Sequence, residues 1–154
     1  MPCCRLDSCF ESEREMTEEL SNKNLMLTVI RAFKEGDTAP LFAAVSPDII
    51  WKSNAPPEFF GGGGETTGLA EMKARIALVF SQYTFVRFQP TAIVTQGDIV
   101  LGQFEVEAFH QRSGKTVKTA MSIRWTVRRG MIMTHEGFFD TASVLLQQGD
   151  VKAA

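Results

Sequence analysis

The last third of the chain constrains the fold more than any other part of the sequence. From Thr84 onward, apolar and polar residues alternate with a period of two, which is typical of β-strands with one buried face. Four strands are predicted, and turns that each contain a glycine separate them, which favours antiparallel hairpins. The strands cover residues 84–95, 98–110, 116–128 and 131–139. Because a sheet with one apolar face must bury that face against other elements, we expect an α+β domain.

The predicted helices lie mainly before these strands. The first begins near Ser12 or Thr17 and ends at Gly36, which suits the left-handed position after a helix. A short second helix and a third helix follow, over residues 41–45 and 67–82. Asp140 precedes an apolar run and is expected to cap a short C-terminal helix. The expected architecture is a curved antiparallel sheet wrapped around three helices from the N-terminal half.

Length, charge and cysteine content narrow the class of protein. The 154 residues suit one domain, predicted over residues 13–150, with residues 1–12 as a disordered tail. A formal net charge of -2 gives no general attraction to nucleic acid or to anionic membranes, so neither is expected as a partner. The apolar runs are too short to span a bilayer and no secretory signal pattern is present, so a cytoplasmic location is predicted. Cys3, Cys4 and Cys9 lack the spacing of a zinc site, and no metal is expected there.

A short strand predicted at residues 48–54 adds a second group of inward-facing side chains. Ile49, Trp51 and Ser53 share one parity, so Trp51 and Ser53 are expected to face the interior. The glycine run at residues 61–64 lacks the lysine and Ser/Thr pattern of a phosphate-binding loop. It is interpreted either as a mobile flap near a pocket or, with preference, as a plain surface loop.

The outward positions of the predicted sheet carry charges. Glu105, Glu107 and Glu136 share the outward parity. Lys118, Arg124 and Arg128 stand at outward positions of a neighbouring strand, where ion pairs with these glutamates across strands can form. We expect this charged face to lie at or near the interface of a dimer.

Several short motifs occur in an order typical of one superfamily. They are Gly-Asp at 36–37, Ser-Pro-Asp-Ile-Ile-Trp at 46–51, Pro-Pro at 56–57, Ser-Gly-Lys at 113–115, Arg-Gly-Met-Ile at 129–132 and Gly-Phe-Phe-Asp at 137–140. Over residues 24–148 the chain resembles the NTF2-like superfamily, specifically its SnoaL-like, ketosteroid-isomerase-like and limonene-epoxide-hydrolase-like branches. The resemblance implies a cone of curved sheet with a deep apolar pocket, and a homodimer formed through the outer sheet face.

The same resemblance argues against the best-known reactions of these branches. The epoxide hydrolases use an Asp-Arg-Asp set, whose arginine and first aspartate positions fall by alignment on Phe104 and Val106, and whose second aspartate position falls on Gly137. Their assisting Tyr and Asn positions hold Trp51 and Ser53, and the base position of the ketosteroid isomerases falls at or next to Ser53. Both mechanisms would then lack the carboxylate that takes the proton.

His135 remains the candidate catalytic residue. It shares strand parity with Met133 and Gly137, so it is expected to point into the pocket, where an imidazole with a pKa near neutrality can act as acid or base. The alternative is a structural histidine bonded to a neighbouring polar group. Trp51 is expected to stack on a planar ligand, and Ser53 to hydrogen-bond it. The predicted substrate-binding residues all occupy inward positions of the strands: Trp51, Ser53, Phe104, Val106, Met121, Ile123, Trp125, Met133 and Gly137.

Two function classes remain open. The first is a cofactor-free enzyme that moves a proton on a small hydrophobic, cyclic or polyketide-like substrate, in an isomerisation, cyclisation or dehydration. The second is a non-catalytic module that binds an apolar ligand or a protein partner, and the missing carboxylates favour it. The sequence carries no flavin, nicotinamide or metal signature, so no cofactor is expected.

Overall fold

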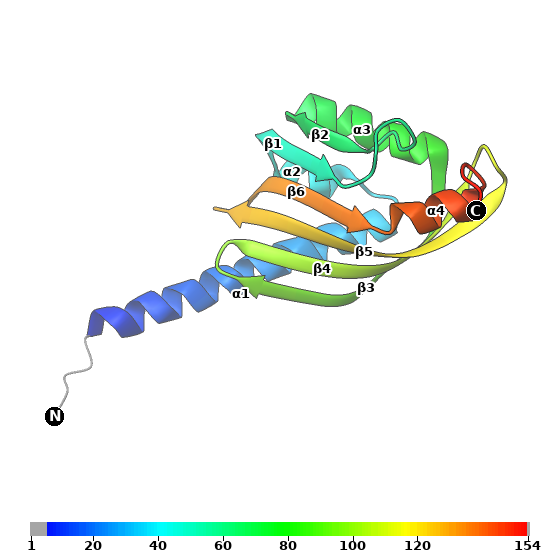
Figure 1. Ribbon diagram of the computed structural model, residues 1–154. Helices are drawn as coiled ribbons and strands as arrows, with labels where there is room; N and C mark the ends of the chain where they lie inside the picture. Colours follow the sequence, from blue (N-terminus) through cyan, green and yellow to red (C-terminus); the bar gives the residue numbers. More distant parts are fainter. Residues whose placement is uncertain (1–5, 154) are drawn as a thin grey trace.

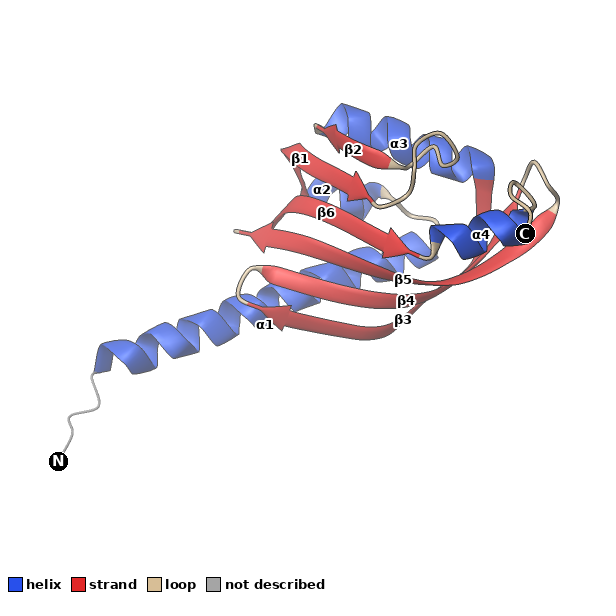
Figure 2. Cartoon of the chain, viewed as in Figure 1, coloured by secondary structure: helices blue, strands red, loops and turns tan. Residues whose placement is uncertain are grey.

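One strongly curved sheet forms the body of the protein, and α1, α2 and α3 contribute to the core on its concave side (Figure 1; Figure 2). The computed structural model describes residues 6–153, with side chains from Phe10 onward. The strands are β1 (Val45–Ser53), β2 (Gly64–Thr67), β3 (Tyr83–Gln96), β4 (Ile99–His110), β5 (Lys115–Arg128) and β6 (Met131–Phe139). The helices are α1 (Leu6–Lys34), α2 (Ala39–Ala44), α3 (Leu69–Gln82) and α4 (Thr141–Gln148).

The strands follow the order β2-β1-β6-β5-β4-β3 across the sheet. All neighbours are antiparallel except β1 and β6, which run parallel. This one pair departs from the predicted antiparallel pattern. The reason lies in how the strands are connected. Helix α3 links β2 at one edge of the sheet to β3 at the opposite edge, and β3, β4, β5 and β6 then follow one another as an antiparallel meander. The last strand of this meander, β6, lies beside β1 and runs parallel to it.

The four long strands agree with the sequence prediction to within one residue at each end. Along β4, buried and more exposed residues alternate, as a sheet with one covered face requires. The strand β1 begins three residues earlier than predicted, at Val45. The strand β2 was not predicted, because it has only four residues and follows directly on the glycine run.

Helix α1 begins at Leu6, before the predicted start near Ser12 or Thr17. No glycine or proline interrupts residues 6–12, so the helix continues through the segment that the sequence pattern assigned to a tail. The predicted polar stripe, which includes Asn24 and Thr28, is exposed. The N-terminal half of α1 extends past the ends of the strands (Figure 1). Cys3, Cys4 and the side chain of Cys9 lie outside what the structure describes.

The C-terminal end of α1 follows the predicted cap. Gly36 has a φ of 80°, in the left-handed region, and its N–H donates to the carbonyl of Phe33. The N–H of Asp37 donates to the carbonyl of Ala32, and these two bonds satisfy carbonyls that the end of the helix leaves open. The Asp37 carboxylate then accepts from the N–H of Ala39 at 3.0 Å, at the start of α2.

Two apolar clusters fill the interior. The larger lies between α1, α2, α3 and the concave face, and Phe104 and Met26 are among its most completely buried side chains. The smaller lies between the β1–β2 loop, the start of β3 and α4, around Tyr83 and Val144. Phe85 packs against both clusters, and residues of both border a cavity on the concave face.

Candidate functional site

An apolar cavity of about 170 Å³ lies between the two clusters. Its volume is similar to that of an engineered apolar cavity of about 150 Å³ that holds benzene. None of the described residues that line it is Asp, Glu, Lys or Arg. The strands contribute Trp51, Ser53, Tyr83, Phe85, Val106, Ala108, Val117, Thr119, Met121, Ile123, His135, Gly137 and Phe139. The loops and helices contribute Ala55, Phe60, Gly62, Ile76, Val79, Gln82 and Val144.

Most of the residues predicted to form a site come together in this cavity. They are Trp51, Ser53, Val106, Met121, Ile123, His135 and Gly137. Strand parity had indicated all of them, because each sits at an inward position of a strand on the concave face. Their common origin is the middle of the sheet, where β1, β6, β5 and β4 are neighbours.

Phe104, Trp125 and Met133 do not line the cavity. The rings of Phe104 and Trp125 point inward as predicted, but they fill the larger cluster, where Phe104 stacks on Phe88 with centroids 4.5 Å apart. Gly102 leaves the room for both rings, since a Cβ there would lie 2.7 Å from Phe104 and 2.9 Å from Trp125. Strand parity separates inner from outer positions, but it does not tell the packed part of a concave face from the open part.

A bulge removes Met133 from the inward row. Ile132 pairs with Val127 and Thr134 pairs with Thr126, so Met133 is the extra residue between them. The inward row of β6 therefore contains Ile132 before the bulge and His135 and Gly137 after it, and of these Ile132 and Gly137 are buried while His135 is half-buried. The predicted shared parity of Met133 with His135 is wrong for this reason.

The cavity also uses residues that the sequence reasoning missed. Phe139 and Ala108 sit at inward positions on strands that were already identified, so parity could have found them. Tyr83 begins β3 directly after α3, and its hydroxyl donates to the buried Gln148 side chain at 2.7 Å. Phe60 comes from the β1–β2 loop, whose path no local pattern in the sequence predicts.

The glycine run at residues 61–64 packs tightly against α3 and the end of β1. A Cβ on Gly62 would lie 2.5 Å from Val79 Cγ2, and one on Gly63 would lie 2.4 Å from the carbonyl oxygen of Ala55. Gly62 and Gly63 are buried, and Gly62 lines the cavity. The preferred interpretation as a plain surface loop is therefore wrong: the glycines allow the loop to close over one side of the cavity.

Trp51 and His135 form a stacked pair in the wall of the cavity. Their ring centroids are 3.9 Å apart and their planes differ by 3°. The indole N–H of Trp51 donates to the carbonyl of Gly62 at 3.2 Å, which ties the ring to the glycine loop. Because His135 covers one face of Trp51, that face is not available to a planar ligand, contrary to the predicted stacking role.

His135 is held as a neutral imidazole. The indole N–H of Trp125 donates to His135 Nδ1 at 3.0 Å, Trp51 covers one face of the ring, and the ring borders the cavity. Burial lowers the pKa of His135 from 6.5 to about 3, because no anionic partner compensates the lost hydration of the charged form. The predicted pKa near neutrality is therefore wrong, and the residue is a poor proton acceptor at neutral pH.

Two polar residues outside the cavity, Asp140 and His110, have structural partners. The Asp140 carboxylate accepts from the N–H of Ser143 at 2.9 Å and caps α4, as predicted. The Nδ1 atom of His110 lies 2.8 Å from Ser113 Oγ at the tip of the β4–β5 hairpin. Among the described residues, no group of three or more His, Cys, Asp or Glu side chains is arranged to hold a metal ion.

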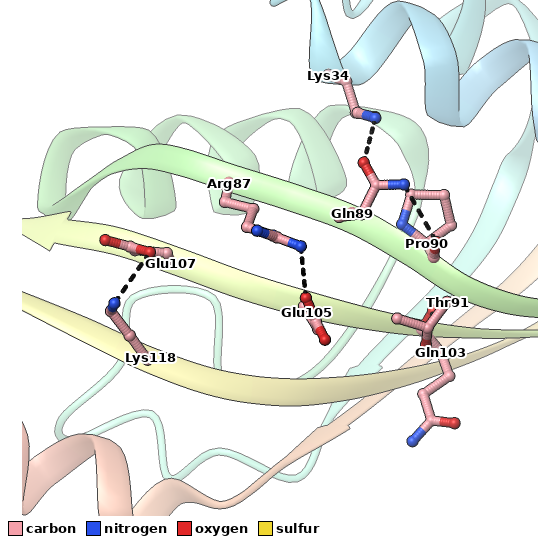
Figure 3. Close-up of polar contacts among 9 residues, drawn as sticks. All are labelled: Lys34, Arg87, Gln89, Pro90, Thr91, Gln103, Glu105, Glu107 and Lys118. Carbon is pink, nitrogen blue, oxygen red and sulfur yellow. Dashed lines mark hydrogen bonds and ion pairs between the residues drawn. The ribbon is translucent and has the colours of Figure 1, made fainter.

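The outer face of the sheet carries ion pairs between neighbouring strands (Figure 3). Glu107 pairs with Lys118 at 3.4 Å and Glu136 with Arg124 at 3.7 Å, as the outward parity predicted. Glu105 pairs instead with Arg87 of β3, at 2.7 Å. These charges are all on the side of the sheet opposite the cavity, so they take no part in its chemistry.

Comparison with known proteins identifies the fold. A family model described as a SnoaL-like domain matches residues 27–135. None of the described helices is long and apolar enough to cross a membrane. The comparison with curated proteins finds no match.

Solved structures with the same architecture cover most of the chain. An NTF2-like protein of unknown function from Burkholderia pseudomallei is 23% identical, with a TM-score of 0.76 over 82% of this chain and 96% of that chain. TerC, co-crystallized with polyporic acid, is 25% identical, with a TM-score of 0.74 over 84% of this chain and 98% of that chain. An LEH-like epoxide hydrolase from M. tuberculosis is 16% identical, with a TM-score of 0.66 over 86% of this chain and 92% of that chain.

The fold is therefore NTF2-like, as the curved sheet, the helices of the N-terminal half and the short C-terminal helix indicate. The family model spans more than two thirds of the chain, from α1 to His135 in the cavity wall. On this match, the chain belongs to the SnoaL-like family.

Proposed function

We propose that this protein binds a small, predominantly apolar molecule in the cavity between the two core clusters. The observation that carries the proposal is a partly open apolar cavity with a few polar groups at its wall and no charged side chain among its described lining residues. An empty apolar cavity of this size costs stability, and a ligand of about one ring would recover the lost contacts. Membership of the SnoaL-like family is consistent with this use of the fold. The relative TerC has been crystallized with polyporic acid.

A matched pair of variants tests this binding. Ala108 lines the cavity and Ala120 lies on the outer face of the neighbouring strand. Ala108→Leu fills the cavity and is expected to weaken the binding of toluene at least tenfold, whereas Ala120→Leu leaves the affinity unchanged. Toluene titrations followed by NMR on the two variants and the wild type measure this difference. Equal affinity in all three proteins would exclude the cavity as the binding site.

Native mass spectrometry of the purified protein would in addition reveal any ligand retained from the cell.

A second candidate is cofactor-free catalysis on such a ligand, by isomerisation, cyclisation or dehydration. The observation in its favour is that His135 borders the cavity. With its pKa lowered to about 3, His135 would act as a neutral hydrogen-bond donor that polarises an oxygen of the substrate, as a neutral imidazole does in triosephosphate isomerase. Turnover should then stay flat between pH 5 and 8 and collapse in His135→Gln. Unchanged turnover in His135→Gln would remove His135 from any mechanism.

We also propose that two copies associate through the outer face of the sheet. Exposed apolar residues lie there among the ion pairs, and Leu101 pairs with Val94 of β3 and with Arg124 of β5. In a symmetric dimer the patch on one subunit contacts the same patch on the other subunit. A charge introduced there would lie close to its copy on the partner, and the two like charges would repel each other. Leu101→Glu is expected to shift the protein to monomers in native mass spectrometry. The control Leu78→Glu places the same charge on an exposed residue of α3 and should leave the dimer intact. A wild-type protein that is monomeric at micromolar concentration would rule out this interface.

A further inference from the structure

The hydrogen bond between Trp125 and His135 determines which imidazole nitrogen carries the proton. An indole N–H can only donate, so the Nδ1 atom that it contacts at 3.0 Å must be the unprotonated acceptor. A neutral imidazole has one protonated nitrogen, and in His135 that nitrogen is therefore Nε2. Burial keeps the ring neutral throughout the physiological pH range.

The Nε2–H group of His135 has no acceptor among the described residues. Within the described part of the chain, the one side-chain hydrogen bond of this ring is that at Nδ1. Every buried side-chain nitrogen and oxygen atom in the described part of the chain does have a partner, so Nε2 must lie at a surface, and His135 lines the cavity. The donor is therefore presented to whatever occupies the cavity.

Gly137 keeps this donor accessible. A Cβ on Gly137 would lie 3.7 Å from His135 Nε2, so a side chain at this position would begin in van der Waals contact with the donor. Ser53 pairs with Gly137 in the parallel β1–β6 ladder and lines the same cavity. Its Oγ accepts from the N–H of Ala55 at 3.2 Å, which leaves the hydroxyl proton free to donate.

The other polar side chains that line the cavity either hydrogen-bond to the protein or can donate a hydrogen bond to a ligand. The Trp51 indole donates to the carbonyl of Gly62, and the Tyr83 hydroxyl donates to Gln148. The Oε1 atom of Gln82 accepts from the N–H of Gly61, so its amide nitrogen is the part of the group left to donate. Thr119 Oγ1 donates to the carbonyl of Ala120, so the hydroxyl oxygens of Thr119 and Tyr83 remain as acceptors. The described wall thus offers the donors of His135, Ser53 and Gln82 in neutral groups, and its lining includes neither a carboxylate nor a cation.

We propose that the cavity selects a neutral ligand with a hydrogen-bond acceptor, which the Nε2–H of His135 binds, and that Trp125 is the positioning residue that sets this tautomer. The inference rests on the proposed binding function and specifies the ligand class. An anionic ligand would bury its charge without a cation, and a cationic ligand would find no carboxylate. A carbonyl oxygen on a ring-sized apolar body satisfies the donor at no such cost.

Two isosteric probes separate acceptor recognition from apolar binding. Acetophenone and α-methylstyrene have nearly the same shape, but only acetophenone carries an oxygen acceptor. Since one net hydrogen bond is worth about 0.5–1.5 kcal/mol, the wild-type protein should bind acetophenone about 2- to 10-fold more tightly. In His135→Phe, which keeps an aromatic ring against Trp51 but has no donor, this ratio is expected to fall towards one while α-methylstyrene still binds.

The outcomes distinguish apolar binding in the cavity from selection of an acceptor by His135. If both probes bind the wild-type protein equally, acceptor selection is wrong and apolar binding in the cavity stands. If neither probe binds, both the proposed function and this inference fail. A preference for acetophenone that persists in His135→Phe would show that a donor other than His135 hydrogen-bonds to its oxygen, and would overturn the role of His135.

The role of Trp125 is tested by nitrogen-15 NMR of the two histidines. In the wild-type protein, His135 is expected to show a single Nε2–H tautomer between pH 5 and 8. Trp125→Phe removes the donor to Nδ1 and should produce a mixture of tautomers, together with a reduced preference for acetophenone. A wild-type spectrum with the proton on Nδ1 would overturn the proposal even if the variant failed to fold.

Discussion

Trp51 and His135 lie directly opposite each other on adjacent parallel strands, and their rings are stacked 3.9 Å apart. Residues in register on parallel strands have the same parity, so both rings must lie on the cavity side of the sheet. The stack joins two segments that are more than eighty residues apart in the sequence. The stack covers one face of the imidazole, and in our proposal His135 acts through its Nε2–H edge as a hydrogen-bond donor and not as a stacking surface.

The lowered pKa of His135 predicts a loss of stability in acid. The folded state holds this pKa near 3 and the unfolded chain near 6.5, so between these values the unfolded state binds more protons. Stability from this group is therefore complete above about pH 6.5 and declines as the pH falls towards 3, by up to about 1.4 kcal/mol per pH unit. Urea denaturation at pH 7, 6, 5 and 4 measures this slope.

His135→Phe provides the matched control for this pH dependence. The variant retains every carboxylate and also His110, whose pKa is lowered by burial, so those contributions cancel in the comparison. The wild-type free energy of unfolding should fall more steeply than that of the variant below pH 6. Parallel pH profiles would mean that His135 is not desolvated in the folded protein.

Asp140 is predicted to stabilise α4 through its cap. Asp140→Ala removes the acceptor of the Ser143 N–H and should lower the free energy of unfolding by about 1 kcal/mol. Asp140→Asn keeps a side-chain oxygen at the same position and should cost much less. Chemical denaturation of both variants checks this, and an equal loss in the two would indicate that the negative charge matters more than the hydrogen bond.

Gly62→Ala is predicted to destabilise the protein by about 1–3 kcal/mol, because its Cβ would collide with Val79 Cγ2 at 2.5 Å. The clash involves a side chain, so Val79→Ala in the same protein should recover part of the loss. Gly63→Ala meets the backbone oxygen of Ala55 instead, and Val79→Ala should not rescue it. Thermal denaturation of the single and double variants distinguishes the two cases. A neutral Gly62→Ala would argue against the tight closure of this loop.

The bond between Tyr83 and Gln148 is predicted to link β3 to α4. Tyr83→Phe leaves the buried Gln148 oxygen without its donor and should cost about 1–3 kcal/mol. In a Gln148→Met background, where no oxygen is left unpaired, the same substitution should cost less. A double-mutant cycle by urea denaturation gives the coupling energy, and strictly additive effects would contradict a direct bond.

The sequence located His135, Ser53 and Trp51 on the inner face but misjudged two of their roles. Parity alone assigned the face, and it succeeded because a period of two leaves only two choices for each residue. The pKa of His135 and the occupied face of Trp51 depend on partners that a single strand does not specify. Met133 was misplaced because a bulge shifts the register by one residue without any glycine or proline to signal it.

Local patterns in the sequence were sufficient for the four long strands, their inner and outer faces, and the caps at Gly36 and Asp140, because these features depend on residues that are neighbours along the chain. The tertiary structure alone decided that β1 runs beside β6, that the glycine loop packs against α3, and that the interior leaves a cavity between two clusters. These features arise from contacts between segments far apart in the sequence, whose relative placement depends on how the whole core packs. The chemistry of His135 belongs to this second group: its strand position is local, whereas its proton is placed by Trp125 across the sheet.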